Sequence, residues 1–166
     1  MTIKYKNPYG DYSFENFNKE NAAFVDKTGF IEVIDNLDTK YPVLLRPRRF
    51  GKSTFVQMLD YFYDIAKKDQ YDEVFRGTKI HEMNLPSHNS YHVISFEFSE
   101  IFGNTSQELI KKFSSNILGS IRDFRTRYKD FEFDIESRKN DSPSTIIDEF
   151  FSIYGEYSNN TKDLYI

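Results

Sequence analysis

The chain alternates between short, continuous apolar runs and longer segments with apolar residues at helical spacing. Two continuous runs, YPVLL at residues 41–45 and HVISFEF at residues 92–98, are typical of strands buried on both faces of a sheet. The closing letters DLYI predict the beginning of a third strand. Between these runs, apolar residues recur at intervals of three and four, which indicates amphipathic helices.

Four helices are expected, and local start signals support three of them. Thr28 can cap a short helix, Thr105 with Glu108 forms a capping box, and Ser142 followed by Pro143 marks the beginning of the last helix. In chain order, the residues expected to face the core are Phe30, Ile34 and Leu37; then Phe55, Leu59, Phe62 and Ala66, backed by Met58 and Ile65, in a helix over residues 53–66; then Leu109, Phe113, Ile117, Ile121, Phe124 and Tyr128; and finally Ile146, Ile147, Phe150 and Tyr154.

The order of these elements is strand, loop, helix, strand, helix, helix, strand, which is an α/β order and predicts a parallel sheet covered by helices. Residues 7–28 are polar with scattered aromatic side chains and are interpreted as an irregular docking segment. We expect residues 1–40 to form an N-terminal segment with a short helix, and residues 41–166 to form the main domain. Because the last strand breaks off at its opening, that domain is expected to be incomplete at its C-terminus.

Composition narrows the classes of function. A chain of 166 residues with 39% hydrophobic content can form one domain with a core, which 17 phenylalanines and 12 tyrosines should make aromatic. The absence of cysteine excludes disulfides and cysteine metal sites. A net charge of −4 gives no general electrostatic reason for nucleic-acid binding. Since neither a signal peptide nor a run of 18 apolar residues occurs, we expect a cytoplasmic protein with no membrane partner.

The segment LLRPRRFGKST, residues 44–54, ends as a Walker A phosphate-binding loop (P-loop) ends. Such a loop joins a buried strand to a helix, whose N-terminal N–H groups hold the phosphates. We expect Lys52 to reach the β- and γ-phosphates, the Ser53 hydroxyl to bind Mg²⁺, and Thr54 to donate near the α-phosphate. The predicted nucleotide-binding residues, with ATP and Mg²⁺ as the cofactors, are Arg46, Pro47, Arg48, Arg49, Phe50, Gly51, Lys52, Ser53 and Thr54.

The Walker A signature requires a glycine five residues before Gly51, and Arg46 occupies that place. Pro47 offers another way to begin the turn, because its ring fixes φ. Arg46, Arg48 and Arg49 would then add positive charge around the phosphates. A rival interpretation is a nucleic-acid patch, since four cations lie within seven residues, but no second basic cluster accompanies them.

The block RPRRFGKS at residues 46–53 and the segment VDKT at residues 25–28 resemble the bacterial AAA-ATPase-like domain family. The opening NPYG…SFENF and the stretch FRGTKI at residues 75–80 are similar to it as well, so the resemblance covers nearly the whole chain. It implies that the missing glycine is a family variant and that the fold is a three-layer, P-loop NTPase-type parallel sheet. Carried over by position, Lys52 would be the phosphate-binding lysine and Ser53 the magnesium ligand.

The resemblance also implies features that this sequence does not contain. The Walker B carboxylates are absent because the chain stops at Ile166, and the DLYI segment is where their strand would begin. The implied partners are the missing C-terminal half and a downstream PD-(D/E)XK nuclease-like domain. Without these carboxylates we expect ATP binding with very slow hydrolysis, and an unpaired strand edge at residues 41–45. The alternative is a non-catalytic nucleotide-sensing or structural fragment of a larger regulatory protein.

A metal-dependent nuclease is a further candidate, because Asp134 and Glu136 are spaced as in its signature. Arg138 replaces the required lysine, and a solvated, charged linker is the favoured interpretation.

Other polar residues have two interpretations each. His81, His88 and His92 could suggest a metal site, but surface positions are favoured. Asp26 and Lys27 could shape the nucleotide pocket, or could serve as a helix cap and a surface ion pair. Glu97 could face the nucleotide or leave the sheet.

Overall fold

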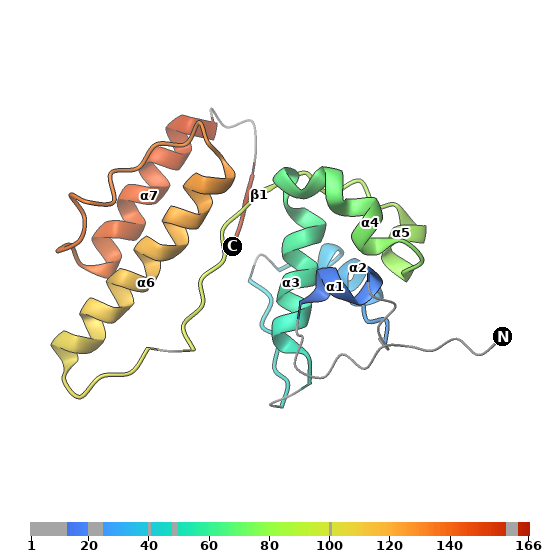
Figure 1. Ribbon diagram of the computed structural model, residues 1–166, viewed down its shortest axis with the longest axis horizontal. Coiled ribbons are helices and arrows are strands. Elements are labelled where there is room, and N and C mark those ends of the chain that lie inside the picture. Colours follow the sequence, from blue (N-terminus) through green and yellow to red (C-terminus); the bar gives the residue numbers. More distant parts are fainter. Residues whose placement is uncertain (1–12, 20–24, 40, 48–49, 100, 159–162) are drawn as a thin grey trace. The chain divides into compact units, whose positions relative to one another are not determined.

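Figure 1 shows the computed structural model of the chain, which is mostly helical and contains a two-stranded parallel sheet. The structure describes residues 13–19, 25–39, 41–47, 50–99, 101–158 and 163–166. They divide into two compact units, Met1–Tyr91 and His92–Ile166. No helix in these described ranges has both the length and the apolar character needed to cross a membrane.

The first unit is built on short helices around an aromatic core. The ring of Phe62 contacts those of Tyr63, Tyr71 and Phe75 at centroid distances of 4.9, 6.2 and 6.1 Å, and Phe14 lies 5.3 Å from Phe75. The helices of this unit are α1 (Phe14–Lys19), α2 (Gly29–Asp35), α3 (Lys52–Tyr63), the 3-10 helix η1 (Ile65–Gln70), α4 (Tyr71–Phe75) and α5 (Lys79–Met83).

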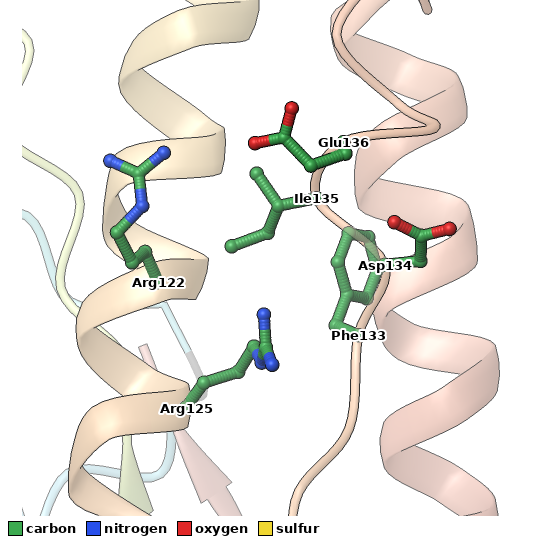
Figure 2. Close-up of a pocket in the computed structure, with 6 residues that line it drawn as sticks. All are labelled: Arg122, Arg125, Phe133, Asp134, Ile135 and Glu136. Atoms are coloured by element: carbon green, nitrogen blue, oxygen red, sulfur yellow. The ribbon is translucent and has the colours of Figure 1, made fainter.

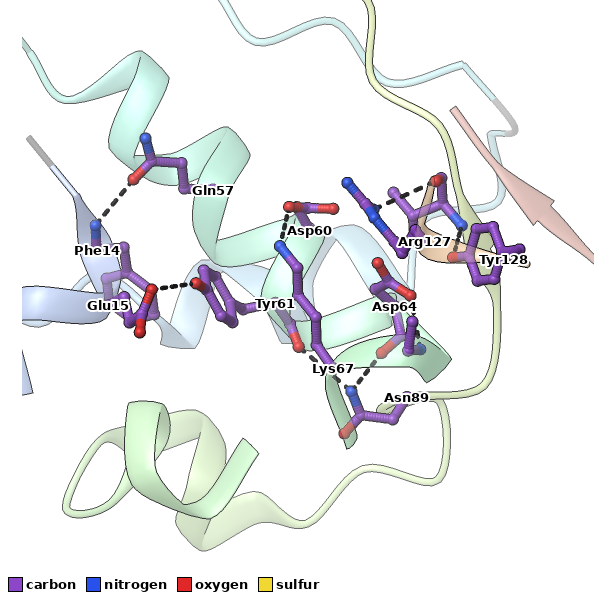
Figure 3. A network of polar contacts seen from close by, with 12 residues as sticks. Phe14, Glu15, Gln57, Asp60, Tyr61, Asp64, Lys67, Asn89, Arg127 and Tyr128 are labelled. Carbon is purple, nitrogen blue, oxygen red and sulfur yellow. Dashed lines mark hydrogen bonds and ion pairs between the residues drawn. The ribbon is translucent and has the colours of Figure 1, made fainter. Parts of the chain in front are cut away.

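Polar contacts connect the surfaces of these helices (Figure 3). The backbone N–H of Phe14 donates to Gln57 Oε1 at 2.8 Å, and the hydroxyl of Tyr61 donates to Glu15 Oε2 at 2.6 Å. Both bonds join α1 to α3, so α1 is held by its backbone as well as by its buried ring.

The second unit packs two long helices against each other. It contains β1 (His92–Val93), α6 (Ser106–Arg127), α7 (Pro143–Ser158) and β2 (Leu164–Tyr165). Phe124 on α6 lies 5.4 Å from the Phe150 ring and 6.0 Å from the Tyr154 ring, both on α7. β1 and β2 pair in parallel, with His92 opposite Leu164 and Val93 opposite Tyr165. A parallel pair needs a long crossover, and α6 and α7 supply it.

The predicted beginnings of α6 and α7 are confirmed, whereas Leu109, which was expected to face the core, is exposed. Thr105 Oγ1 accepts from Glu108 N at 3.2 Å, and Glu108 Oε2 accepts from Asn104 N at 2.9 Å, as a capping box requires. Ser142 Oγ accepts from Thr145 N at 3.2 Å at the beginning of α7. The expected core residues that are buried here are Ile117, Ile121, Phe124, Tyr128, Ile146, Phe150 and Tyr154.

The predicted strand at residues 41–45 is wrong for this structure. The segment forms no strand, and its side chains are exposed, with 85% of Tyr41, 80% of Val43 and 87% of Leu45 accessible. A continuous apolar run becomes a buried strand only when neighbouring strands take its backbone hydrogen bonds and cover both its faces. No described residue does so, and the described part of the chain therefore contains only the β1–β2 pair of the predicted three-layer sheet.

Other expectations need correction. The helix expected over residues 53–66 ends at Tyr63, and Ala66 is exposed in η1. The predicted strand at residues 92–98 is reduced to β1, because β2 offers only two residues for pairing. The predicted irregular segment contains α1, which buries Phe14. The expected core face of α2 is also wrong, since Ile31 is the residue that α2 buries, whereas Phe30 and Leu37 are exposed.

Phe124 offers a direct test of the core of the second unit. Replacing Phe124 by alanine is expected to lower the free energy of unfolding by about 3–5 kcal/mol, because the buried ring leaves a cavity between α6 and α7. Urea denaturation followed by circular dichroism measures this loss. The exposed α6 variant Lys111→Ala should change the same quantity by less than about 0.5 kcal/mol. A loss below about 1 kcal/mol for Phe124→Ala would contradict the packing described here.

Candidate functional site

The predicted P-loop, which we call the basic loop (residues 46–52), leads directly into the first turn of α3. Gly51 is the N-cap, with φ 73° and ψ 29°, a left-handed conformation that glycine adopts without strain. No side chain caps the helix, and its first internal hydrogen bond runs from Phe55 N to Gly51 O at 2.9 Å. The N–H groups of residues 52–54 have no acceptor among the described residues. This helix end therefore presents three free donors and the positive end of its dipole.

The ammonium group of Lys52 is folded back onto the loop. Its Nζ donates to the carbonyl oxygen of Arg46 at 2.8 Å and to that of Pro47 at 2.9 Å. Both bonds therefore connect the first residue of α3 to the backbone of residues 46 and 47. Since an ammonium group has three N–H donors, one of them remains for another acceptor.

Arg46, at the place of the missing glycine, joins the loop to two helices. Its guanidinium carbon lies 5.4 Å from the ring centre of Phe30 on α2 and 5.5 Å from that of Phe55 on α3, which are cation–π distances. This side chain is therefore engaged with aromatic rings. No pattern in the sequence predicts this contact, because the spacing places Phe30 on the core face of its helix.

The remaining predicted loop residues differ in exposure. Pro47, Phe50 and Ser53 are exposed, and Thr54 is partly buried. The hydroxyl of Ser53 makes no hydrogen bond to any described residue. Arg48 and Arg49 lie outside the described residues.

Asp26 joins the VDKT segment to the FRGTKI segment. Its Oδ1 accepts from the backbone N of Thr28 at 2.8 Å and from Thr28 Oγ1 at 2.7 Å, and its Oδ2 accepts from Lys79 N at 2.9 Å. Thr28 Oγ1 in turn accepts from Ile80 N at 3.2 Å. We call these four residues the Asp26 staple. Thr28 is fully buried, and its hydroxyl is engaged in the hydrogen bonds of the staple. It therefore makes no side-chain cap on α2.

Two opposing effects set the pKa of Asp26. Partial burial raises the pKa of this carboxyl group, but hydrogen bonds from the Thr28 hydroxyl, from Lys79 N and from Thr28 N, together with the Lys79 charge, lower it. The second group of effects prevails, and the pKa of Asp26 lies below its ordinary value. The carboxylate is therefore charged near neutral pH.

Lys27 lies between Asp26 and Thr28 in the sequence, and it is not itself one of the four residues of the staple. Its Nζ is 3.9 Å from the position that a Cβ atom on Gly51 would occupy. The structure thus brings a residue of the VDKT segment to the beginning of α3. Sequence spacing could not reveal this contact, because the two segments are far apart along the chain.

The carboxylates of the nuclease-like signature lie in turns. Asp134 Oδ1 accepts from Ser137 N at 3.2 Å, Glu136 pairs with Lys139, and Arg138 pairs with Glu149 at 2.6 Å. The hydrogen bond from Ser137 N lowers the pKa of Asp134. Figure 2 shows Arg122 and Arg125 of α6 across an open pocket of about 370 Å³ from residues 133–136. The nuclease arrangement requires neighbouring strands, and the structure has consecutive turns instead.

The other candidates are engaged within their own units. The rings of His81 and His88 stack on Tyr71 at 5.8 and 4.5 Å, and His92 Nδ1 lies 2.9 Å from the hydroxyl of Tyr154. Glu97 is exposed and accepts from Ser99 N at 3.0 Å. Across the described ranges, no three His, Asp or Glu side chains are grouped so that they could hold a metal ion.

Comparison with protein families identifies the class. The Predicted AAA-ATPase family matches residues 8–163, and the chain belongs to this family. The matched range includes the basic loop and the Asp26 staple, and the resemblance noted from the sequence is confirmed. Comparisons with curated proteins and with solved structures gave no match.

The Asp26 staple predicts a stability difference that depends on pH. Replacing Asp26 by alanine is expected to cost about 1 kcal/mol of unfolding free energy near neutral pH, because the N–H of Lys79 at the beginning of α5 loses its acceptor. Since the pKa of Asp26 is lower in the folded state, this contribution is complete above the unfolded pKa of about 3.9. It disappears as the pH falls through the lower, folded-state pKa.

Urea denaturation at several pH values between about 7 and 2.5 measures this difference. The wild type and Asp26→Ala should converge in stability on acidification below about pH 4. Asp69→Ala, a variant at an exposed carboxylate of η1, should show no comparable convergence. A constant separation between the Asp26→Ala and wild-type curves would contradict the assignment.

Proposed function

We propose that this chain binds ATP with Mg²⁺ through residues 46–54. The observation that carries the proposal is the uncapped first turn of α3, with left-handed Gly51 before it and the Lys52 ammonium beside it, in a member of the Predicted AAA-ATPase family. Free backbone N–H groups at the positive end of a helix form a site for phosphate oxygens. The absence of a Cβ atom on Gly51 leaves room for those oxygens to approach the backbone.

Each residue then has a defined task. The N–H groups of residues 52–54 donate to phosphate oxygens. The Lys52 ammonium donates to the β- and γ-phosphates, either through its third N–H or by giving up one of its hydrogen bonds to a loop carbonyl. The exposed hydroxyl of Ser53, which has no partner among the described residues, fits the role of magnesium ligand. Bound Mg²⁺ neutralises charge on the phosphates. Arg46 contributes by holding the loop to α2 and α3 through Phe30 and Phe55.

We propose that this chain belongs to the P-loop NTPase-type class of folds, which are built on a parallel sheet. Family membership supports this, and so does the parallel pairing of β1 with β2 across two helices. Binding is the activity proposed for this chain, and no residue of it is assigned to hydrolysis.

Lys52 is the decisive test of ATP binding. Replacing Lys52 by alanine should weaken MgATP binding by about tenfold or more, because a charge-assisted hydrogen bond to phosphate is lost. Titration of the 166-residue chain with a fluorescent ATP analogue, together with nucleotide-induced thermal stabilisation, measures the effect. Lys68→Ala, at an exposed lysine of η1, should bind as the wild type does. Equal affinity and equal thermal stabilisation for Lys52→Ala and the wild type would refute the proposal.

Ser53 tests the magnesium assignment separately. Replacing Ser53 by alanine should reduce the gain in ATP affinity that Mg²⁺ produces, while leaving binding in EDTA nearly unchanged. Ser120→Ala on α6 serves as the control. An undiminished magnesium effect in Ser53→Ala would exclude this hydroxyl as a ligand. A parallel assay of phosphate release separates a slow ATPase from a nucleotide-sensing module.

A further inference from the structure

Two sets of contacts position Lys27 beside the basic loop. On one side, the Asp26 staple fixes the backbone of residues 26–28 to the beginning of α5. On the other, the carbonyl of Lys27 itself accepts from Phe30 N at 3.1 Å and so joins the first turn of α2. The Cα atom of Lys27 is thus held by hydrogen bonds on both sides, and only its side chain is free to choose a direction.

The loop is connected to the same helix that follows Lys27. Arg46 lies over Phe30 of α2 and Phe55 of α3, so α2 and the beginning of the loop share one cation–π contact. The Lys27 ammonium then reaches Gly51, 3.9 Å from the site of an added Cβ atom. Lys27 and Lys52 therefore both lie at the N-terminus of α3. Lys27 belongs to the VDKT segment and Lys52 belongs to the basic loop.

The ammonium groups of these two lysines differ in their hydrogen-bond partners. The Lys52 ammonium is satisfied by two loop carbonyls. Lys27 is partly buried as a residue, and its ammonium group makes no hydrogen bond or ion pair with any described residue. A partly buried cation at the positive end of a helix is unfavourable unless an anion is present. The adjacent carboxylate of Asp26 forms no ion pair with Lys27, and its oxygens accept from Thr28 and Lys79 instead.

We propose that Lys27 is a second phosphate-binding cation, which contacts the triphosphate of the nucleotide held by the loop. This inference rests on the proposed ATP binding and adds a residue from outside the Walker A segment to the site. Asp26 and Thr28 are its positioning residues. The VDKT segment thus acts as a unit in which Asp26 and Thr28 fix the backbone and Lys27 supplies the charge.

The test uses the 166-residue chain with MgATP, inorganic tripolyphosphate and adenosine as probes. Lys27→Met keeps the apolar stem and removes the charge, and Lys27→Arg keeps the charge. Lys68→Met, at an exposed lysine of η1 outside the staple, is the matched control. Dissociation constants come from titration calorimetry, and the melting temperature of the free protein is measured for each variant.

Lys27→Met is expected to weaken binding of MgATP and tripolyphosphate by about tenfold or more, with no change for adenosine. Lys27→Arg should remain within about threefold of the wild type, and Lys68→Met within about twofold. The melting temperature of free Lys27→Met should equal or exceed that of the wild type, because an unpaired cation is removed from a positive helix end. A purely structural lysine would lower it.

Two results would overturn the inference and leave ATP binding intact. One is that Lys27→Met binds MgATP as the wild type does while Lys52→Ala loses binding. The other is that Lys27→Met loses both affinity and thermal stability and Lys27→Arg restores neither. If instead Lys52→Ala matches the wild type, ATP binding at the loop itself fails and the role of Lys27 fails with it.

Discussion

The arrangement of the first unit depends on one carboxylate. Asp26 accepts a hydrogen bond from the backbone of Lys79, a residue 53 positions later, while it holds the N–H and hydroxyl of Thr28. The buried hydroxyl of Thr28 then accepts from Ile80 N and fixes the geometry. If this carboxylate were lost, backbone donors would be left without acceptors in a partly buried place, which is costlier than the loss of a surface ion pair.

Aromatic rings provide the other half of the scaffold around the loop. Phe55 and Phe62 both lie on α3, and the former meets Arg46 while the latter is central to the core cluster. An arginine at the position where many phosphate loops have glycine therefore contributes in a different way. It anchors the loop through its side chain, whereas a glycine would contribute backbone freedom. The cost of a less permissive backbone is offset by contact with two helices.

The sequence predicted those parts of the structure that local interactions determine. The beginnings of α6 and α7 follow from Thr105 with Glu108 and from Ser142, which bond to backbone groups within four residues. The prediction of a strand at residues 41–45 is wrong because strand formation depends on neighbouring strands, which local sequence does not specify. Thr28 is predicted as a helix cap because no neighbouring residue in the sequence indicates that its hydroxyl accepts a hydrogen bond from Ile80 N. The Walker A segment was recognised from its letters, whereas the approach of Lys27 to Gly51 required the folded chain.

The bonds from Lys52 to the carbonyls of Arg46 and Pro47 have a consequence for selectivity. A ligand that recruits this ammonium competes with neutral oxygen acceptors already in place, so its net gain is the difference between the two kinds of acceptor. An anionic oxygen is the stronger acceptor and wins this competition, whereas a neutral hydroxyl or amide oxygen gains almost nothing. In the proposed nucleotide site, the loop would therefore discriminate between ligands by their charge.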